Sequence, residues 1–141
     1  MSRRNAFLIA VVLVLVPVQA LAAPAVCLQD QFGNQHFIEV LSVSTFGFIA
    51  IVGQVNFSPS FPFNDVASCP SAPLSGTGNV SADQGTVRLG YGVYASTPGC
   101  FPLMVRATLT PSGLTGSLDV MNSGGFTDLT FSPGATCSTT P

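Results

Sequence analysis

Residues Ala82 to Gly125 read ADQGTVRLGYGVYASTPGCFPLMVRATLTPSGLTGSLDVMNSGG, and the spacing of turns in this stretch decides the fold. Four short polar segments end in glycine, at positions 85, 99, 113 and 125. Between them, apolar and polar side chains alternate with a period of two, which is typical of β-strands. Glycine favours the positive φ that tight turns between antiparallel strands require. The stretch therefore predicts a β-meander.

The same turn pattern occurs earlier, at Asp30–Gly33 and Ser44–Gly47. Marking every turn leaves eight predicted strands, at residues 25–30, 34–44, 47–57, 74–81, 85–95, 100–110, 113–122 and 125–132. Closing such a sheet into a barrel removes its exposed edges. Glycines within strands, at 53, 90, 92 and 116, suit the bends that closure requires. We predict an all-β fold, an eight-stranded antiparallel up-and-down meander β-barrel.

Two segments depart from the regular pattern. The strand at 47–57 carries apolar residues on both faces near its start, which predicts that both faces are covered there. The connection at 58–73 is long for a compact domain and contains four prolines. Connections of this length are often functional lids, so we expect this one to cover an end of the barrel.

The first residues predict export. A basic start at Met1–Arg4 is followed by an apolar segment, Ala6–Val16, and by the cleavage pattern Ala20-Leu21-Ala22. We therefore predict a secretion signal peptide at 1–22 and a single β-barrel domain at 23–141, located in the periplasm or outside the cell. The apolar segment is shorter than the roughly 20 residues that span a bilayer, which disfavours an uncleaved anchor. No other apolar run is long enough to span a membrane as a helix, so no stable membrane insertion is expected after cleavage.

The charge of the mature chain excludes several partners. The mature chain has six acidic residues and only two cationic side chains, Arg88 and Arg106, which gives a net charge of about −4 (2 − 6). The chain has no lysine. Without a basic patch, nucleic acids and anionic lipid surfaces are poor partners. Charged residues make up 7% of the chain, against roughly 25–35% of a usual soluble surface. Such a surface tolerates association, including a homo-oligomer.

Four cysteines in an exported chain predict two disulfides, with three possible connectivities. Strand direction alternates in a meander, so counting turns assigns each cysteine to one end of the barrel. Cys69 and Cys100 fall at one end, and Cys27 and Cys137 fall at the other, beside the seam between first and last strands. Because bonded cysteines need Cα atoms within about 7 Å, we predict the pairs Cys69–Cys100 and Cys27–Cys137.

Catalytic chemistry finds little support in the sequence. His36 is the only histidine, and no adjacent residue supplies the partner that acid–base catalysis requires. The acidic residues are scattered, and the cysteines are better used in disulfides than as metal ligands. We predict a protein that is not an enzyme and has no metal or cofactor.

Aromatic residues gather at one predicted end of the barrel, beside the 58–73 loop. Small eight-stranded barrels either fill their interior with side chains or hold one small ligand. These aromatics are therefore either a plug for the core or the mouth of a ligand site. The candidate ligand-binding residues are Phe32, Phe57, Phe61, Phe63, Tyr94, Phe101 and Phe126.

Eight meandering strands after a secretion signal, with one end covered by a loop, resemble the calycin barrels, the lipocalins and avidins. The resemblance is one of architecture, because the signature tryptophans of both families are absent from a chain without tryptophan. It implies a binding module and not an enzyme.

Our first hypothesis is an exported barrel that binds a small apolar or aromatic ligand at the rim covered by the 58–73 loop. The alternative is a structural or surface-interaction barrel with a solid core and no ligand. An outer-membrane barrel is less favoured, because Arg88 and Arg106 lie on the outward faces of two predicted strands, where a membrane barrel needs apolar bands.

Overall fold

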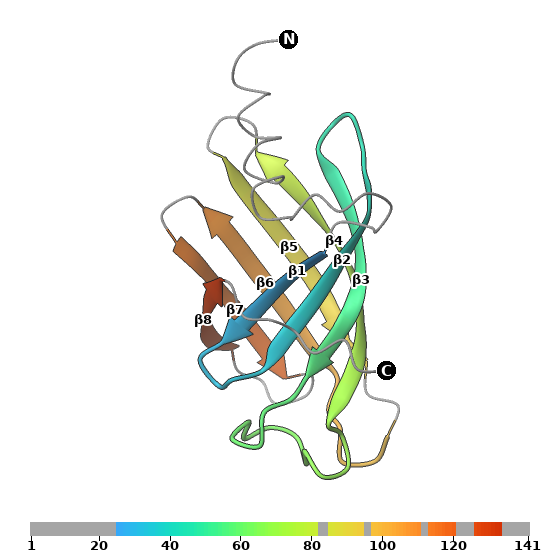
Figure 1. The fold of residues 1–141 in the computed structure, drawn as a ribbon, viewed down its shortest axis with the longest axis vertical. Coiled ribbons are helices and arrows are strands. Elements are labelled where there is room, and N and C mark those ends of the chain that lie inside the picture. Colours follow the sequence, from blue (N-terminus) through green and yellow to red (C-terminus); the bar gives the residue numbers. More distant parts are fainter. Residues whose placement is uncertain (1–24, 82–84, 95–96, 111–112, 121–125, 134–141) are drawn as a thin grey trace.

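The computed structural model describes residues 25–81, 85–94, 97–110, 113–120 and 126–133, which form one closed antiparallel barrel (Figure 1). Each strand pairs with the next along the chain, and β8 returns to pair with β1. The predicted eight-stranded up-and-down barrel is confirmed. The strands are β1 (Ala25–Asp30), β2 (Gln35–Val43), β3 (Phe48–Asn56), β4 (Ser71–Ser81), β5 (Thr86–Val93), β6 (Leu103–Thr110), β7 (Gly113–Val120) and β8 (Phe126–Pro133). The predicted signal peptide lies outside the described residues.

Glycine sets the first two turns, as the sequence predicts. The Gly33 amide donates to the Asp30 carbonyl over 2.9 Å, and Gly33 has a φ of 83°. The Gly47 amide donates to the Ser44 carbonyl over 3.0 Å, again with a φ of 83°. A residue with a side chain would be strained at either glycine, so these two turns fix the β1–β2 and β2–β3 hairpins.

The turn near residue 98 is displaced by one residue from its predicted position. The Cys100 amide donates to the Thr97 carbonyl over 3.1 Å, so Gly99, with a φ of 91°, is the third residue of the turn and not the fourth. A type II turn favours proline second and glycine third, and Pro98-Gly99 supplies both.

Strand β4 begins at Ser71, three residues before the predicted start, and therefore contains Pro73. The carbonyl of Pro73 accepts from the Tyr94 amide at the end of β5 over 2.9 Å. In an antiparallel sheet, one residue directs its amide and carbonyl to the same neighbour, so the missing amide of Pro73 faces β5 and leaves the ladder to β3 intact. The connection from β3 to β4 is accordingly shorter than predicted and is called loop 57–70 below.

The barrel interior is filled by apolar side chains from all eight strands. Gly76 on β4 faces Tyr91 on β5, where a Cβ atom would overlap the Gly90 carbonyl oxygen and lie 2.6 Å from the Tyr91 Cα. Only glycine allows the two strands to approach so closely. The most deeply buried strand residues of this interior are Leu28, Ile38, Ile51, Val55, Leu74, Tyr91, Val93, Leu103, Val105, Ala107, Leu118 and Leu129.

The seam between β1 and β8 is short. Three residue pairs join the strands, among them Asp30 opposite Phe131. The Gln31 side chain reinforces the seam, because its amide nitrogen donates to the Asp128 carbonyl over 2.6 Å and its oxygen accepts from the Thr130 amide over 2.9 Å. A side chain from the first turn thus completes the ladder on β8.

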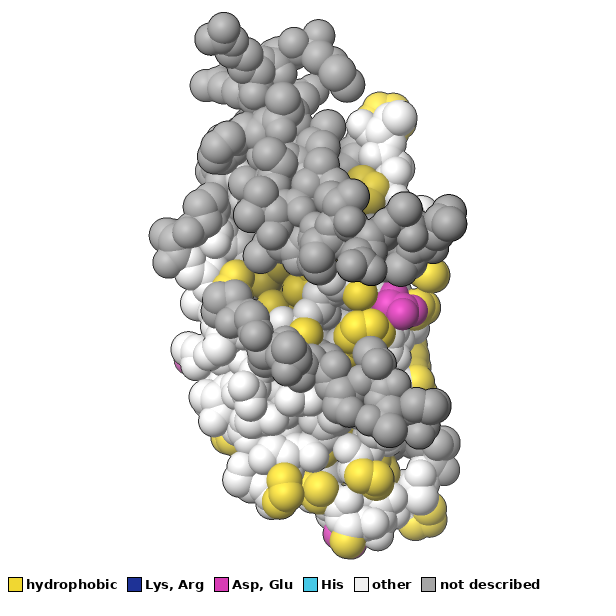
Figure 2. All heavy atoms as spheres, viewed as in Figure 1, with side chains coloured by type: hydrophobic (Ala, Val, Ile, Leu, Met, Phe, Trp, Pro, Cys, Tyr) yellow, Lys and Arg dark blue, Asp and Glu magenta, His cyan; other side chains and the backbone are white. Residues whose placement is uncertain are grey.

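The β2–β3 hairpin reaches past the rest of the sheet, at the upper right of Figure 1. The prediction that both faces of the third strand are covered near its start is wrong, because Phe48 is 65% exposed. No described segment packs on the outer face of the barrel there, and Figure 2 shows hydrophobic side chains at the hairpin tip. We call this end of the barrel the hairpin end, and the opposite end, with loop 57–70, the loop end.

Candidate functional site

Four of the seven candidate aromatics meet at the loop end. The rings of Phe57 and Phe61 stack with centroids 5.4 Å apart. Phe32 and Phe63 contact Phe61 edge-on, at 5.7 and 5.4 Å. Phe57 and Phe61 belong to the buried core, and the other two rings are partly buried against it. This group therefore closes the loop end of the interior.

The other three candidate aromatics point elsewhere. Tyr94 is 55% exposed, Phe101 is 51% exposed and Phe126 is 70% exposed. In the described part of the chain, none of these three rings forms an aromatic pair with the four clustered rings. Counting turns predicts the end of the barrel at which a residue lies, but not whether its side chain points inward.

Loop 57–70 is fixed to the segment before β6. The predicted disulfide Cys69–Cys100 is present, with an S–S distance of 2.06 Å and a Cα separation of 5.5 Å. Beside it, the Phe101 amide donates to the Asn64 side-chain oxygen over 2.6 Å. A disulfide is consistent with an oxidising environment. For the second predicted pair, Cys137 lies outside the described residues, and Cys27–Cys137 stays a prediction.

A polar network is buried inside the barrel, where the sequence predicts only an isolated histidine. His36 Nε2 lies 2.8 Å from Asp30 Oδ2, and His36 Nδ1 lies 2.8 Å from the Tyr91 hydroxyl. The Asp30 carboxylate accepts, so Nε2 donates to it, and in that tautomer Nδ1 accepts from the Tyr91 hydroxyl. The expectation that His36 has no positioned partner is therefore wrong. Asp30 precedes it by six residues, and Tyr91 follows it by 55.

The Asp30 carboxylate is the centre of this network. It also accepts from the Phe32 amide, the Asn34 amide and the Asn34 side-chain nitrogen, each over 3.0 Å. The Asn34 side-chain oxygen in turn accepts from the Ser58 amide over 2.9 Å. The network thus ties the first turn to the start of loop 57–70.

The three side chains of this network are buried. Asp30 is 4% exposed, and His36 and Tyr91 are each 1% exposed. Burial, with the negative charge of Asp30 as a smaller cause, raises the pKa of Tyr91 well above its ordinary value of 10.0. In the described structure, these three buried side chains satisfy one another's hydrogen bonds inside the core.

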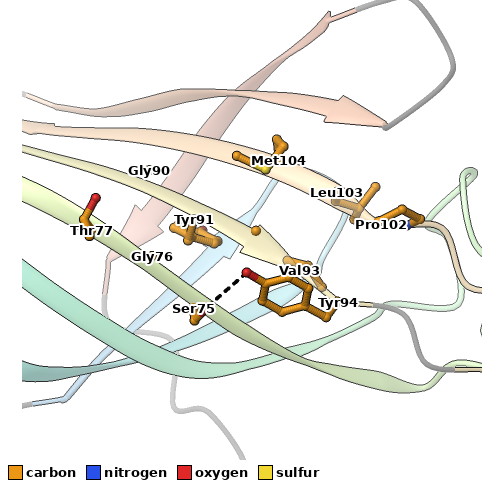
Figure 3. A pocket seen from close by; sticks show the side chains of 11 residues that line it. Ser75, Gly76, Thr77, Gly90, Tyr91, Val93, Tyr94, Pro102, Leu103 and Met104 are labelled. Atoms are coloured by element: carbon orange, nitrogen blue, oxygen red, sulfur yellow. Dashed lines mark hydrogen bonds between the residues drawn. The ribbon is translucent and has the colours of Figure 1, made fainter.

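An open hollow lies outside the barrel, over β4, β5 and β6 near the loop end (Figure 3). Its volume is about 280 Å³, and its lining contains no charged residue. Tyr94 forms one wall and accepts a hydrogen bond from the Ser75 hydroxyl over 3.2 Å, while Met104 stands on β6 across the hollow. The lining consists of Ser75, Gly76, Thr77, Gly90, Tyr91, Gly92, Val93, Tyr94, Pro102, Leu103 and Met104.

Two outward-facing glycines leave the floor of the hollow bare. A Cβ atom at Gly90 would meet nothing closer than 3.9 Å, and one at Gly92 would meet Met104 Sδ at 3.5 Å. Neither glycine is required by crowding, although the sequence assigns both to bends of the barrel. The signal in the sequence was their alternation with the inward-facing Tyr91.

Metal ligands do not gather in the described part of the chain, where no group of three histidine, cysteine, aspartate or glutamate residues could hold an ion. Within the same residues, no helix is long and apolar enough to cross a membrane.

The closed eight-stranded antiparallel barrel agrees with a calycin-like architecture. Comparison with protein-family models, curated proteins and solved structures found no significant match to this chain.

Proposed function

We propose that this protein is an exported barrel that binds a small, uncharged apolar or aromatic molecule in the outer hollow at its loop end. The observation that carries the proposal is the hollow itself, an uncharged concavity with an aromatic wall and a bare glycine floor. The proposed site includes Tyr94 from the predicted set, and no residue of loop 57–70 lines it. It lies outside the barrel because the described interior positions are filled by side chains.

The lining supports a flat ligand of modest size. Ligand pockets usually measure roughly 300–1,000 Å³, so a hollow of about 280 Å³ suits a molecule of one or two rings. The bare floor at Gly90 and Gly92 allows a ring to approach the strand backbone closely. Tyr94 offers an aromatic face and Met104 a polarisable thioether. The Ser75 hydroxyl donates its proton to Tyr94, so its oxygen can accept a hydrogen bond from a polar edge of the ligand.

Export is part of the proposal. The basic and apolar start of the chain, followed by Ala20-Leu21-Ala22, has the pattern of a cleaved secretion signal. The Cys69–Cys100 disulfide supports the same address, because disulfides persist outside reducing compartments. The proposed ligand is therefore one met in the periplasm or outside the cell.

Filling the hollow tests the proposal. The variant Gly92→Val places a side chain on the floor, where its Cβ fits without backbone overlap, and we expect the barrel to remain folded. Titration with N-phenylnaphthylamine, an uncharged fluorescent probe, should give saturable binding to the unchanged protein and at least tenfold weaker binding to Gly92→Val.

The matched control is Thr115→Val, a valine placed on the exposed outer face of β7, away from the hollow. It should bind the probe as the unchanged protein does. Absence of saturable binding, or equal binding by Gly92→Val, would contradict the proposal. Thermal unfolding of all three proteins confirms that they are folded.

The filled interior also supports a second candidate function, a structural or surface-interaction barrel without a ligand. This function requires an oligomer or a partner, so light scattering separates it from the first. A monomer that binds the probe at the hollow supports the ligand-binding function, and an oligomer without probe binding supports the second.

A further inference from the structure

The β2–β3 hairpin ends in four exposed apolar side chains, which we call the apolar tip. Leu41 is 59% exposed, Val43 is 56% exposed, Phe46 is 85% exposed and Phe48 is 65% exposed. They lie close together in the sequence around the Ser44–Gly47 turn, and the hairpin that carries them projects from the barrel (Figures 1 and 2). Large apolar side chains grouped on a projecting surface usually mark a contact with a partner.

The apolar tip itself carries no charge. No residue between Glu39 and Asp65 is acidic or basic. Two opposite charges flank the tip: Glu39 lies on β2 two residues before Leu41, and Arg88 on β5 is in register with Phe48, with β4 between them. The tip therefore has no charged group of its own to desolvate on entering an apolar phase, and its one basic flank is balanced by its one acidic flank.

The backbone at the tip satisfies its own hydrogen bonds. The Ser44 amide donates to the Phe48 carbonyl over 2.8 Å, and the Gly47 amide donates to the Ser44 carbonyl over 3.0 Å. The Ser44 hydroxyl oxygen accepts from the amides of Phe46 and Phe48, over 3.3 and 3.0 Å. Unpaired backbone groups are the main obstacle to placing a turn among lipids, and these bonds reduce that obstacle.

The tip is also held in position. The Gly47 carbonyl accepts from the Val80 amide on β4 over 2.9 Å, so the turn is bonded to a second hairpin of the barrel. A tip that is already ordered loses little conformational entropy when it binds.

We propose that the apolar tip inserts reversibly into the interface of an uncharged phospholipid bilayer and docks the hairpin end of the barrel on the membrane surface. A bilayer interface accepts a projecting apolar point without a matching cavity, and an uncharged tip with one acidic and one basic flank gains nothing from anionic lipid. The contact is shallow, since it involves one turn and not a spanning segment. It leaves the hollow, at the loop end, away from the membrane.

Vesicle flotation tests this proposal. The secreted protein, with its processed N-terminus verified by mass spectrometry, is mixed with phosphatidylcholine vesicles and separated on a density gradient. We expect it to float with the vesicles, with equal binding at low and high salt and no gain when phosphatidylglycerol is added. The double variant Phe46→Ser/Phe48→Ser should lose at least tenfold in partitioning.

The control is Phe126→Ser, which removes a phenylalanine that is 70% exposed from the loop end. It should float as the unchanged protein does, and circular dichroism and melting temperature verify the fold of each variant. Failure of the unchanged protein to bind phosphatidylcholine would overturn the proposal, as would an equal loss in Phe126→Ser. Light scattering without lipid provides a further test. If the unchanged protein is a dimer and the double variant is a monomer, the tip contacts a second copy of the chain, and the proposal of membrane insertion is overturned.

Discussion

Replacing Asp30 by asparagine should destabilise the barrel more than any other single charge removal in the described chain. The carboxylate accepts four hydrogen bonds in the core, from the Phe32 and Asn34 amides, the Asn34 side chain and His36. Asparagine has one side-chain oxygen, which can remain on the two backbone amides. Its nitrogen then faces the donors of Asn34 and His36.

Neither donor can easily turn away from the new nitrogen. The Asn34 amide is held because its oxygen accepts from Ser58. His36 can change tautomer, but Nδ1 then donates to the Tyr91 hydroxyl, whose own proton loses its acceptor. Two hydrogen bonds to a charged group are lost, each worth about 1.5–3 kcal/mol, and relief from burying the charge offsets part of the sum. We expect a net loss of about 3 kcal/mol in the free energy of unfolding, or about 12 °C in melting temperature.

The measurement is urea and thermal unfolding at neutral pH, followed by circular dichroism with the disulfides intact. The control is Asp128→Asn, which makes the same change at an exposed carboxylate on β8 and should alter stability by less than about 0.5 kcal/mol. A loss below about 1 kcal/mol for Asp30→Asn, or an equal loss in the control, would refute this account of the network.

Three further predictions concern stability. Because the pKa of Tyr91 is raised in the folded protein, the unfolded chain loses the Tyr91 proton at lower pH than the folded protein does. The free energy of unfolding should therefore be constant below about pH 10 and fall above it by up to about 1.4 kcal/mol per pH unit. Unfolding curves measured at alkaline pH should show this fall for the unchanged protein and not for Tyr91→Phe. Gly76→Ala should prevent secretion of folded protein, because its Cβ would overlap the Gly90 carbonyl; a well-folded variant on a circular dichroism spectrum would contradict this. Replacing both Cys69 and Cys100 by alanine removes a disulfide that closes a loop of 31 residues, and should lower the free energy of unfolding in urea by about 3–4 kcal/mol. An unchanged urea midpoint would show that other contacts hold loop 57–70.

Local signals in the sequence predicted most of the fold. Gly33 and Gly47 mark two hairpins because a positive φ is a property of a single position. Counting the turns then gives the direction of each strand and the end of the barrel at which each cysteine lies. For this reason the pairing of Cys69 with Cys100 could be predicted without any motif. The start of β4 could not be predicted in this way. A strand can include Pro73 only if no ladder hydrogen bond needs its missing amide, and that depends on which neighbouring strand the amide position faces.

The candidate site was less predictable, because it depends on the direction of side chains and on contacts between distant residues. Tyr94 and Phe57 were placed at the correct end, yet one points outward and the other into the core. The partners of His36 were missed because Tyr91 is far away in the chain and meets it only after the barrel closes. All three network residues had inward positions on their strands, and that shared orientation was the available signal.

The short seam has a consequence for how the chain reaches its native state. Asp30 and Phe131 are joined across nearly the whole length of the domain, and Gln31 is bonded to Asp128 and Thr130. Closing so long a loop is slow because its entropic cost precedes any gain from the contact. The barrel is therefore completed only when its last strand is available. Until then, β1 and the strand left at the other edge expose unpaired backbone, so a chain truncated before β8 should aggregate instead of folding to a smaller barrel.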